Sequence, residues 1–262
     1  MLALIVCMLA IGAVAGLLSG LFGIGGGIVL VPLMIWLFEL SGFPVDSIVH
    51  MAIATSLATI IPTSISSVLA HQRIGTLQWP AVLLIAPYMF IGAILGSVIA
   101  GHLSGDLLKI VFAVYLIIVA VRMWLQKTSS KPQISPNKLV MASAGISIGT
   151  LSSLLGIGGG TLSVPFLTFY GYPMRHAVAV SAACGVPIAI AGSLGYAFFV
   201  NGNSTLPTYS LGFIYLPAFL AVIVTSVSLA PVGAHLAKRL PVKPLKRLFA
   251  AIVFAVGMKL LW

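Results

Sequence analysis

The stretch Leu21-Phe22-Gly23-Ile24-Gly25-Gly26-Gly27 decides the fold, because it returns later in the chain as Leu154-Leu155-Gly156-Ile157-Gly158-Gly159-Gly160. Both copies run on to a Val-Pro pair, and the match extends upstream, where Gly12, Gly16 and Ser19 correspond to Gly145, Gly149 and Ser152. A match of this length indicates an internal repeat. Both copies lie inside long apolar stretches, so each predicts a break in a membrane helix. Irregular backbone survives in hydrocarbon only where it is buried in protein or lines a polar cavity, and paired breaks of this kind point to the substrate site of a transporter.

The composition predicts an integral membrane protein. Of 262 residues, 60% are hydrophobic and 6% are charged, and the mean hydropathy is +1.20. A soluble domain carries roughly 25% charged residues, so this chain could not cover a surface in water. The net charge of +10 comes from Lys and Arg scattered over the connecting segments. That pattern fits positively charged cytoplasmic loops and indicates no nucleic-acid partner.

Five apolar segments are predicted in each half of the chain. The first repeat, 1–125, and the second, 139–262, flank a hydrophilic cytoplasmic linker at 126–138. The segments cover 2–19, 28–38, 49–70, 79–101 and 107–125, and then 139–154, 161–171, 176–200, 209–235 and 245–262. The second segment of each half is shorter than the about 20 residues of a full crossing. We therefore expect half-helices there, either spanning with their neighbours or folded back as hairpins.

The charges predict that the two halves are inverted relative to each other. The loop 39–49 has two acidic residues and no Lys or Arg, whereas its counterpart 171–176 contains Arg175. Likewise, the connection that contains Arg73 corresponds to an uncharged connection at 201–208 in the second half. By the positive-inside rule, Arg73, the linker, Arg175 and the basic stretch 238–247 lie in the cytoplasm. The predicted fold class is an all-α polytopic membrane protein of two inverted repeats.

The triple glycines are candidate anion-binding loops. Gly25, Gly26 and Gly27, and Gly158, Gly159 and Gly160, permit positive φ and directly precede helices that begin near residues 28 and 161. Their amides, with the positive end of each half-helix, can bind an anion without a charged side chain. The alternative is that the glycines only let helices pack closely, as Gly12, Gly16, Gly145 and Gly149 do at four-residue spacing. A nucleotide loop is disfavoured because no P-loop Lys follows.

Polar residues of segments 49–70 and 176–200 are candidates to complete the site. Ser56 aligns with Ser181, and we expect these hydroxyls to bind the substrate together with Thr55 and Cys184. Thr55 aligns with Val180, which breaks the symmetry. The alternative is that such hydroxyls bond their own helix or a neighbouring one.

Ionisable residues are confined to segment ends. Glu39, Asp46 and Asp106 all lie there, so no carboxylate is expected at the bilayer midplane to bind a cation or relay protons. We identify no catalytic set, no metal-ligand cluster and no cofactor motif. The two cysteines, Cys7 and Cys184, form no CxxC pair. The sequence thus disfavours an enzyme and a cation pump.

The chain resembles the TauE/SafE sulfite-exporter family. The resemblance rests on the twofold glycine string, on Ala54-Thr55-Ser56, on His71-Gln72-Arg73-Ile74-Gly75, and on the paired segments Gly96–Phe112 and Gly233–Phe249. It implies a permease of the bacterial inner membrane, a secondary transporter of sulfite, sulfoacetate or related organosulfonates, with no cofactor. We expect the anion to lie between the glycine loops and to be carried by alternating access. The alternatives are an anion channel and a carrier of another small organic anion; the expected partners are the bilayer and the anion, with homo-oligomerisation left open.

Overall fold

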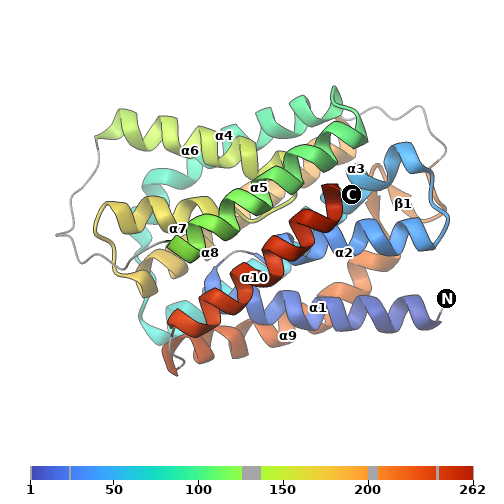
Figure 1. Cartoon of the computed structure of the whole chain (residues 1–262). Helices are drawn as coiled ribbons and strands as arrows, with labels where there is room; N and C mark the ends of the chain where they lie inside the picture. Colours follow the sequence, from blue (N-terminus) through green and yellow to red (C-terminus); the bar gives the residue numbers. More distant parts are fainter. Residues whose placement is uncertain (1, 24, 126–136, 200–205, 240–241, 262) are drawn as a thin grey trace.

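The computed structural model describes residues 2–23, 25–125, 137–199, 206–239 and 242–261. Within these residues the chain forms ten helices and a two-stranded hairpin, arranged as an elongated bundle (Figure 1). The first half contains α1 (Leu2–Phe22), α2 (Gly27–Leu40), α3 (Val45–Ile74), α4 (Trp79–Gly101) and α5 (Gly105–Leu125). The second half contains α6 (Lys138–Leu154), α7 (Gly160–Phe169), α8 (Met174–Phe198), β1 (Ser210–Leu211), β2 (Ile214–Tyr215), α9 (Leu216–Arg239) and α10 (Val242–Leu261).

The predicted all-α multi-pass membrane fold is confirmed. Five of the described helices, α1, α3, α4, α8 and α9, are long and apolar enough to cross a membrane. Their burial divides them into two groups. The spans of α3 and α8 are 83% and 78% buried, whereas the span of α9 is 28% buried and that of α4 is 39% buried. Helices α3 and α8 therefore form the centre, and the others surround them with apolar side chains facing outward.

The short second segments are half-helices, as predicted. Helix α2 has 14 residues and α7 has 10. Figure 1 shows α2 turning back from the end of α1, so that the two form an antiparallel hairpin. Both half-helices begin after a left-handed glycine, Gly26 at φ 78° and ψ −12° and Gly159 at φ 77° and ψ −12°. The repeat in the sequence is thus also a repeat of backbone conformation.

Close helix packing explains the glycines spaced four apart. A methyl group placed on Gly16 of α1 would lie 2.4 Å from the carbonyl oxygen of Ser226 in α9. One placed on Gly149 of α6 would lie 2.1 Å from the carbonyl oxygen of Met89 in α4. Only glycine allows backbones to approach so closely. The expectation that these glycines serve helix packing is confirmed.

The helices of the two halves pack on each other in exchanged pairs. Helix α1 packs along α9, and its repeat counterpart α6 packs along α4, the counterpart of α9. In the same way α3 packs on α9 while α8 packs on α4. The remaining outer helices, α5 and α10, pack on each other. Each of these interfaces between the two halves therefore has a counterpart that is formed by the corresponding helices of the other half, and the α5–α10 interface pairs two corresponding helices.

The three acidic residues of the chain lie at one end of the bundle. Glu39 at the end of α2 pairs with Lys109 of α5 at 3.7 Å. The starts of α3 and α5, which carry Asp46 and Asp106, are adjacent, because the Cβ position of Gly105 lies 3.5 Å from the carbonyl oxygen of Asp46. At the opposite end of the bundle, the last turn of α3, which carries Arg73, lies close to the start of α8. There His176 Nδ1 donates a hydrogen bond to the Thr76 carbonyl at 2.8 Å.

The hairpin of β1 and β2 departs from the prediction of an apolar segment at 209–235. Helix α9 begins only at Leu216. Upstream, Ser210 pairs with Tyr215 in antiparallel register, and the chain reverses through Gly212 at φ 54°. The residues 209–215 are mostly apolar, so their hydropathy could not distinguish a short hairpin from the start of a helix.

The close contact between α6 and α4 predicts that Gly149→Ala destabilises the protein. The added methyl group would meet backbone that cannot move aside without separating two helices, and overpacking of this kind costs about 1–3 kcal/mol. We expect a lower Tm and a smaller monodisperse fraction after detergent extraction. Gly105→Ala is the matched control, because its nearest neighbour is 3.5 Å away, so its Tm should stay at the wild-type value. An unchanged Tm for Gly149→Ala would contradict this account of the packing.

Candidate functional site

The two glycine loops touch each other inside the protein. A methyl group placed on Gly25 would lie 3.1 Å from the Cα atom of Gly158, and one on Gly27 would lie 2.3 Å from the carbonyl oxygen of Gly156. The six candidate glycines of the two loops are all buried. Loops that are distant in the sequence, and that the repeat had singled out, thus meet where the two halves join.

The loops have the backbone conformation that glycine favours. Gly25 has φ 69°, Gly26 has φ 78° and Gly159 has φ 77°, all in the region that side-chain-bearing residues rarely adopt. The expectation of positive φ is confirmed at these three positions, whereas Gly27, Gly158 and Gly160 do not have positive φ. Each half-helix begins at the residue after its left-handed glycine, at Gly27 and at Gly160.

The first amides of α2 and α7 are candidate hydrogen-bond donors for a ligand. Gly27 and Ile28, and Gly160 and Thr161, are the first residues of these two helices, so their N–H groups have no acceptor within the helix. The first amides of any helix lack an intrahelical partner, and the helix dipole adds partial positive charge there. Both loops therefore offer donors suited to an anion.

Two aligned serines brace the loops across the junction between the halves. Ser56 of α3 donates its hydroxyl hydrogen to the carbonyl of Gly156 at 2.8 Å. Ser181 of α8 donates to the carbonyl of Gly23 at 3.0 Å. Each serine thus holds the glycine loop of the opposite half. We call these two hydrogen bonds the serine braces.

The serine braces define what Ser56 and Ser181 can do in this conformation. A hydroxyl has a single hydrogen, and here both hydrogens are donated to carbonyl oxygens. The Ser163 Oγ lies 2.8 Å from Ser181 Oγ and 2.9 Å from the Gly159 carbonyl oxygen, so its one hydrogen is shared between these two acceptors. In this arrangement the two serines position the loops, and their hydrogens become available to a substrate only if the braces break.

Thr55 and Cys184, the other candidates, have different surroundings. The Thr55 hydroxyl accepts a hydrogen bond from the amide of Tyr215 at 3.0 Å and so anchors strand β2 to α3. Cys184 is 1% exposed and belongs to an apolar cluster formed by α3, α4, α6, α7 and α8. Thr55 therefore contacts the hairpin, and Cys184 contacts the apolar core.

Several buried hydroxyls that the sequence analysis did not select have no partner. Within the described residues, the serine hydroxyls that are buried without a hydrogen bond belong to Ser19, Ser64, Ser67, Ser152, Ser153, Ser193 and Ser210. Ser19 and Ser152 already stood in the repeated stretch, so the repeat carried a signal for them. Ser64 had no such signal, because the second half has Ala189 at the corresponding position.

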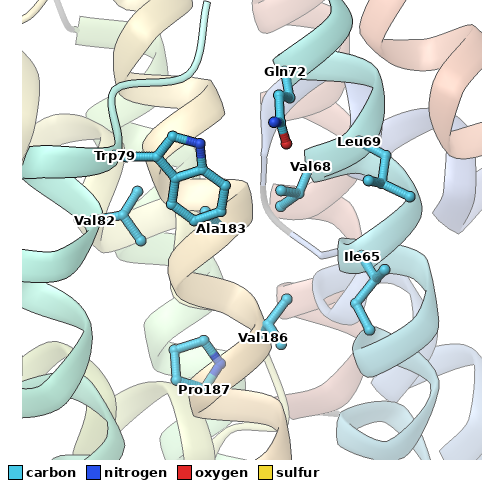
Figure 2. A pocket seen from close by; sticks show the side chains of 9 residues that line it. All are labelled: Ile65, Val68, Leu69, Gln72, Trp79, Val82, Ala183, Val186 and Pro187. Atoms are coloured by element: carbon cyan, nitrogen blue, oxygen red, sulfur yellow. The ribbon is translucent and has the colours of Figure 1, made fainter.

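A separate cavity of about 350 Å³ lies between α3, α4 and α8. Figure 2 shows that its wall is built almost entirely of apolar side chains, with the Gln72 amide at one end. Its lining residues are Ile65, Val68, Leu69, Gln72, Trp79, Val82, Ala183, Val186 and Pro187. Such a wall cannot offset the cost of removing an anion from water. The glycine loops are therefore the better candidate for an anion site.

The serine braces predict that Ser56→Ala and Ser181→Ala destabilise the fold to a similar degree. Each change leaves a carbonyl without its donor, at a cost of about 1–3 kcal/mol. The free energy of unfolding in mixed micelles checks this. Ser143→Ala is the control, since Ser143 is exposed and bonds only its own helix, so its change should stay under about 0.5 kcal/mol. If both brace variants were as stable as the wild type, the braces would not hold the loops.

Comparison with known proteins agrees with this architecture. The sequence profile of the family described as "Sulfite exporter TauE/SafE" matches residues 8–260. A "Probable membrane transporter protein" of Haemophilus influenzae is 37% identical over 260 residues, which cover 98% of this chain and 97% of the relative. A protein of the same description from Methanocaldococcus jannaschii is 28% identical, covering 99% and 96% of the two chains. The match extends over nearly the whole length, glycine loops included, and the chain therefore belongs to the TauE/SafE sulfite-exporter family of membrane transporters.

Proposed function

We propose that this protein is a secondary transporter that carries a small sulfur-containing oxyanion, sulfite or an organosulfonate such as sulfoacetate, by alternating access. The observation that carries the proposal is the meeting of two buried glycine loops, each of which directly precedes the first turn of a half-helix. Gly25, Gly26, Gly27, Gly158, Gly159 and Gly160 provide the backbone of this binding site.

Hydrogen-bond donors and the absence of nearby carboxylates favour an oxyanion. Glu39, Asp46 and Asp106 lie at one end of the bundle, away from the glycine loops. An oxyanion has several oxygens that accept hydrogen bonds in different directions, so a set of amides and hydroxyls can surround it. A spherical halide benefits less from such directed donors, which supports selectivity for sulfite-type anions.

The contact between the two glycine loops supports a mechanism in which the loops separate during transport. Gly25 and Gly158 approach too closely for an anion to fit between them, so transport requires the loops to separate. Separation breaks the serine braces and frees the hydroxyl hydrogens of Ser56 and Ser181. These hydrogens then bind the anion, and rocking of one half against the other exposes the site to each side in turn.

The directions of the helices support an inverted repeat. In Figure 1, α1 runs from the end marked N toward the opposite end, whereas its counterpart α6 starts at that opposite end and runs back. The acidic end then faces outside, and the end with Arg73 and Arg175 faces the cytoplasm, as the positive-inside rule requires. Residues 126–136 of the linker and residues 200–205 lie outside the described part of the chain, so labelling positions are chosen in other turns.

Transport by the purified protein in proteoliposomes tests the proposed function. Labelled sulfite should enter by saturable exchange, and thiosulfate and sulfoacetate should compete while chloride should not. Gly26→Ala and Gly159→Ala should lower the initial rate at least about tenfold, because each methyl group requires an unfavourable φ and meets a neighbour within 2.8 Å.

Gly75→Ala is the control that distinguishes a loss of transport caused by a change in the site from one caused by backbone strain alone. Gly75 has φ 79° with open space around its Cβ position, so this variant has the same strain but should transport at close to the wild-type rate. Equal inhibition by chloride and sulfite would instead indicate a nonselective anion channel. Exchange of carboxylates but of no sulfur oxyanion would indicate a carrier of another organic anion.

Cysteine labelling tests the inverted topology. The exposed turn residues Ser41, between α2 and α3, and Pro173, between α7 and α8, occupy related places in the two halves. In a Cys7→Ser background, a membrane-impermeant maleimide should label Ser41→Cys in intact cells and Pro173→Cys only after permeabilisation. Cys184 is buried and should stay unlabelled. Labelling of both turns from one side would rule out inversion.

A further inference from the structure

Two of the unpartnered hydroxyls lie beside the second glycine loop. Ser152 Oγ is 3.4 Å from the Cβ position of Gly159, and Ser64 Oγ is 2.9 Å from the Cβ position of Gly185. That same position on Gly185 is 3.2 Å from the carbonyl oxygen of Gly158. Ser152 is 0% exposed and Ser64 is 1% exposed, and neither hydroxyl has a partner in the described part of the chain.

A buried hydroxyl without a partner needs an explanation. Leaving such a group unpaired costs about 1–3 kcal/mol, and in most proteins nearly every buried polar atom is paired. The braces Ser56 and Ser181 show that this fold pairs its loop serines where it can. Ser64 and Ser152, which lie beside Gly185 and Gly159, are donors without an acceptor among the described residues. An anion bound there would supply one.

The first glycine loop is surrounded differently. The alignment that pairs Ser56 with Ser181 also pairs Ile60 with Gly185 and Ser64 with Ala189. The Ile60 side chain fills the space beside the first loop, with Cγ2 3.1 Å from the Cβ position of Gly25. At the second loop, glycine stands in place of this isoleucine and a serine hydroxyl lies next to it.

The first turns of the half-helices show the same difference. Thr161 of α7 corresponds to Ile28 of α2. The Thr161 hydroxyl is hydrogen bonded to the hydroxyl of Tyr115 from α5. Ile28, in contrast, is 2% exposed and belongs to the apolar core. The hydroxyls of Ser64, Ser152 and Thr161 therefore lie beside the second loop, together with the apolar side chain of Ile188, whose Cδ1 is 2.7 Å from the Cβ position of Gly159. Ile60 and Ile28 occupy the corresponding places at the first loop.

We propose that the oxyanion binds asymmetrically, at the second glycine loop, where Ser64 and Ser152 donate hydrogen bonds alongside the amides of Gly160 and Thr161. The inference rests on the proposed function and identifies which half holds the substrate. The backbone of the first loop closes the site opposite the second loop, and its neighbours Ile60 and Ile28 form the apolar side against which the bound anion is enclosed.

Calorimetric titration of sulfite into the purified full-length protein in detergent tests the proposal. Ser64→Ala and Ser152→Ala should each weaken sulfite affinity about tenfold to 100-fold, since each removes a hydrogen bond to a charged group. The matched control is Ser19→Ala, which removes the unpartnered hydroxyl that aligns with Ser152 in the first half, and its affinity should stay within twofold of the wild type.

The Tm of each variant distinguishes binding from structure. Removing an unpartnered buried hydroxyl should leave the Tm unchanged or raise it, so weaker binding with an undiminished Tm marks a substrate contact. Gly185→Ala provides a second route, because its methyl group would occupy the space between Ser64 and the second loop, whereas Gly105→Ala should bind normally.

Three outcomes would overturn the proposal. Wild-type affinity in both Ser64→Ala and Ser152→Ala, in a protein that binds and transports sulfite, would overturn this inference while the proposed function stands. An equal loss in Ser19→Ala and Ser152→Ala would show that the two loops bind alike. If the wild-type protein neither bound nor exchanged sulfite, thiosulfate or sulfoacetate, the proposed function would fail, and this inference with it.

Discussion

A membrane interior provides no water to pair with exposed peptide groups, and this constraint governs how the two glycine loops are built. Each loop interrupts a helix and leaves carbonyl oxygens that must find donors within the protein. Ser56 supplies one such donor to Gly156, and Ser181 supplies one to Gly23. Since each donor comes from the opposite half, neither loop is satisfied by its own repeat. The central position of α3 and α8 follows, because these helices carry the two serines.

The glycines that interrupt the helices also permit contact between the two loops, because they have no side chains. Gly25 meets Gly158 backbone to backbone, and a methyl group on Gly25 would lie 3.1 Å from the Cα atom of Gly158 on a residue at φ 69°. This approach brings together the two loops that precede α2 and α7. Backbone dipoles can then attract an anion where a permanent positive side chain would hold it too tightly or require its own counter-charge. If the loops bind the anion as proposed, a site without ionised groups would suit a carrier that must both take up and release its substrate.

Much of this architecture could be predicted from the sequence, because it depends on local patterns. The repeated glycines indicated the two loops, the length of the apolar runs indicated half-helices, and alignment of the halves paired Ser56 with Ser181. The partners of those serines could not be predicted, since a hydroxyl bonds whatever the tertiary fold brings near it. The hairpin at 210–215 was hidden by its apolar composition. Ser64 was missed because comparison of the repeats selects residues that occur in both halves, and the second half has Ala189 at that position. Ile60 and Gly185 matter because they differ at aligned positions, which such a comparison does not select.

The pairing of α1 with α9 has a consequence for biosynthesis. Helix α1 ends at Phe22 and its main partner begins at Leu216. A ribosome adds about 5–20 residues per second, so the glycine-lined face of α1 waits roughly 10 to 40 s after its own synthesis before that partner emerges. Throughout this interval the first half lies in the bilayer with its tightest packing surface uncovered. The nascent chain therefore completes its core late, when α9 arrives, and the cell must keep the earlier helices from associating wrongly until then.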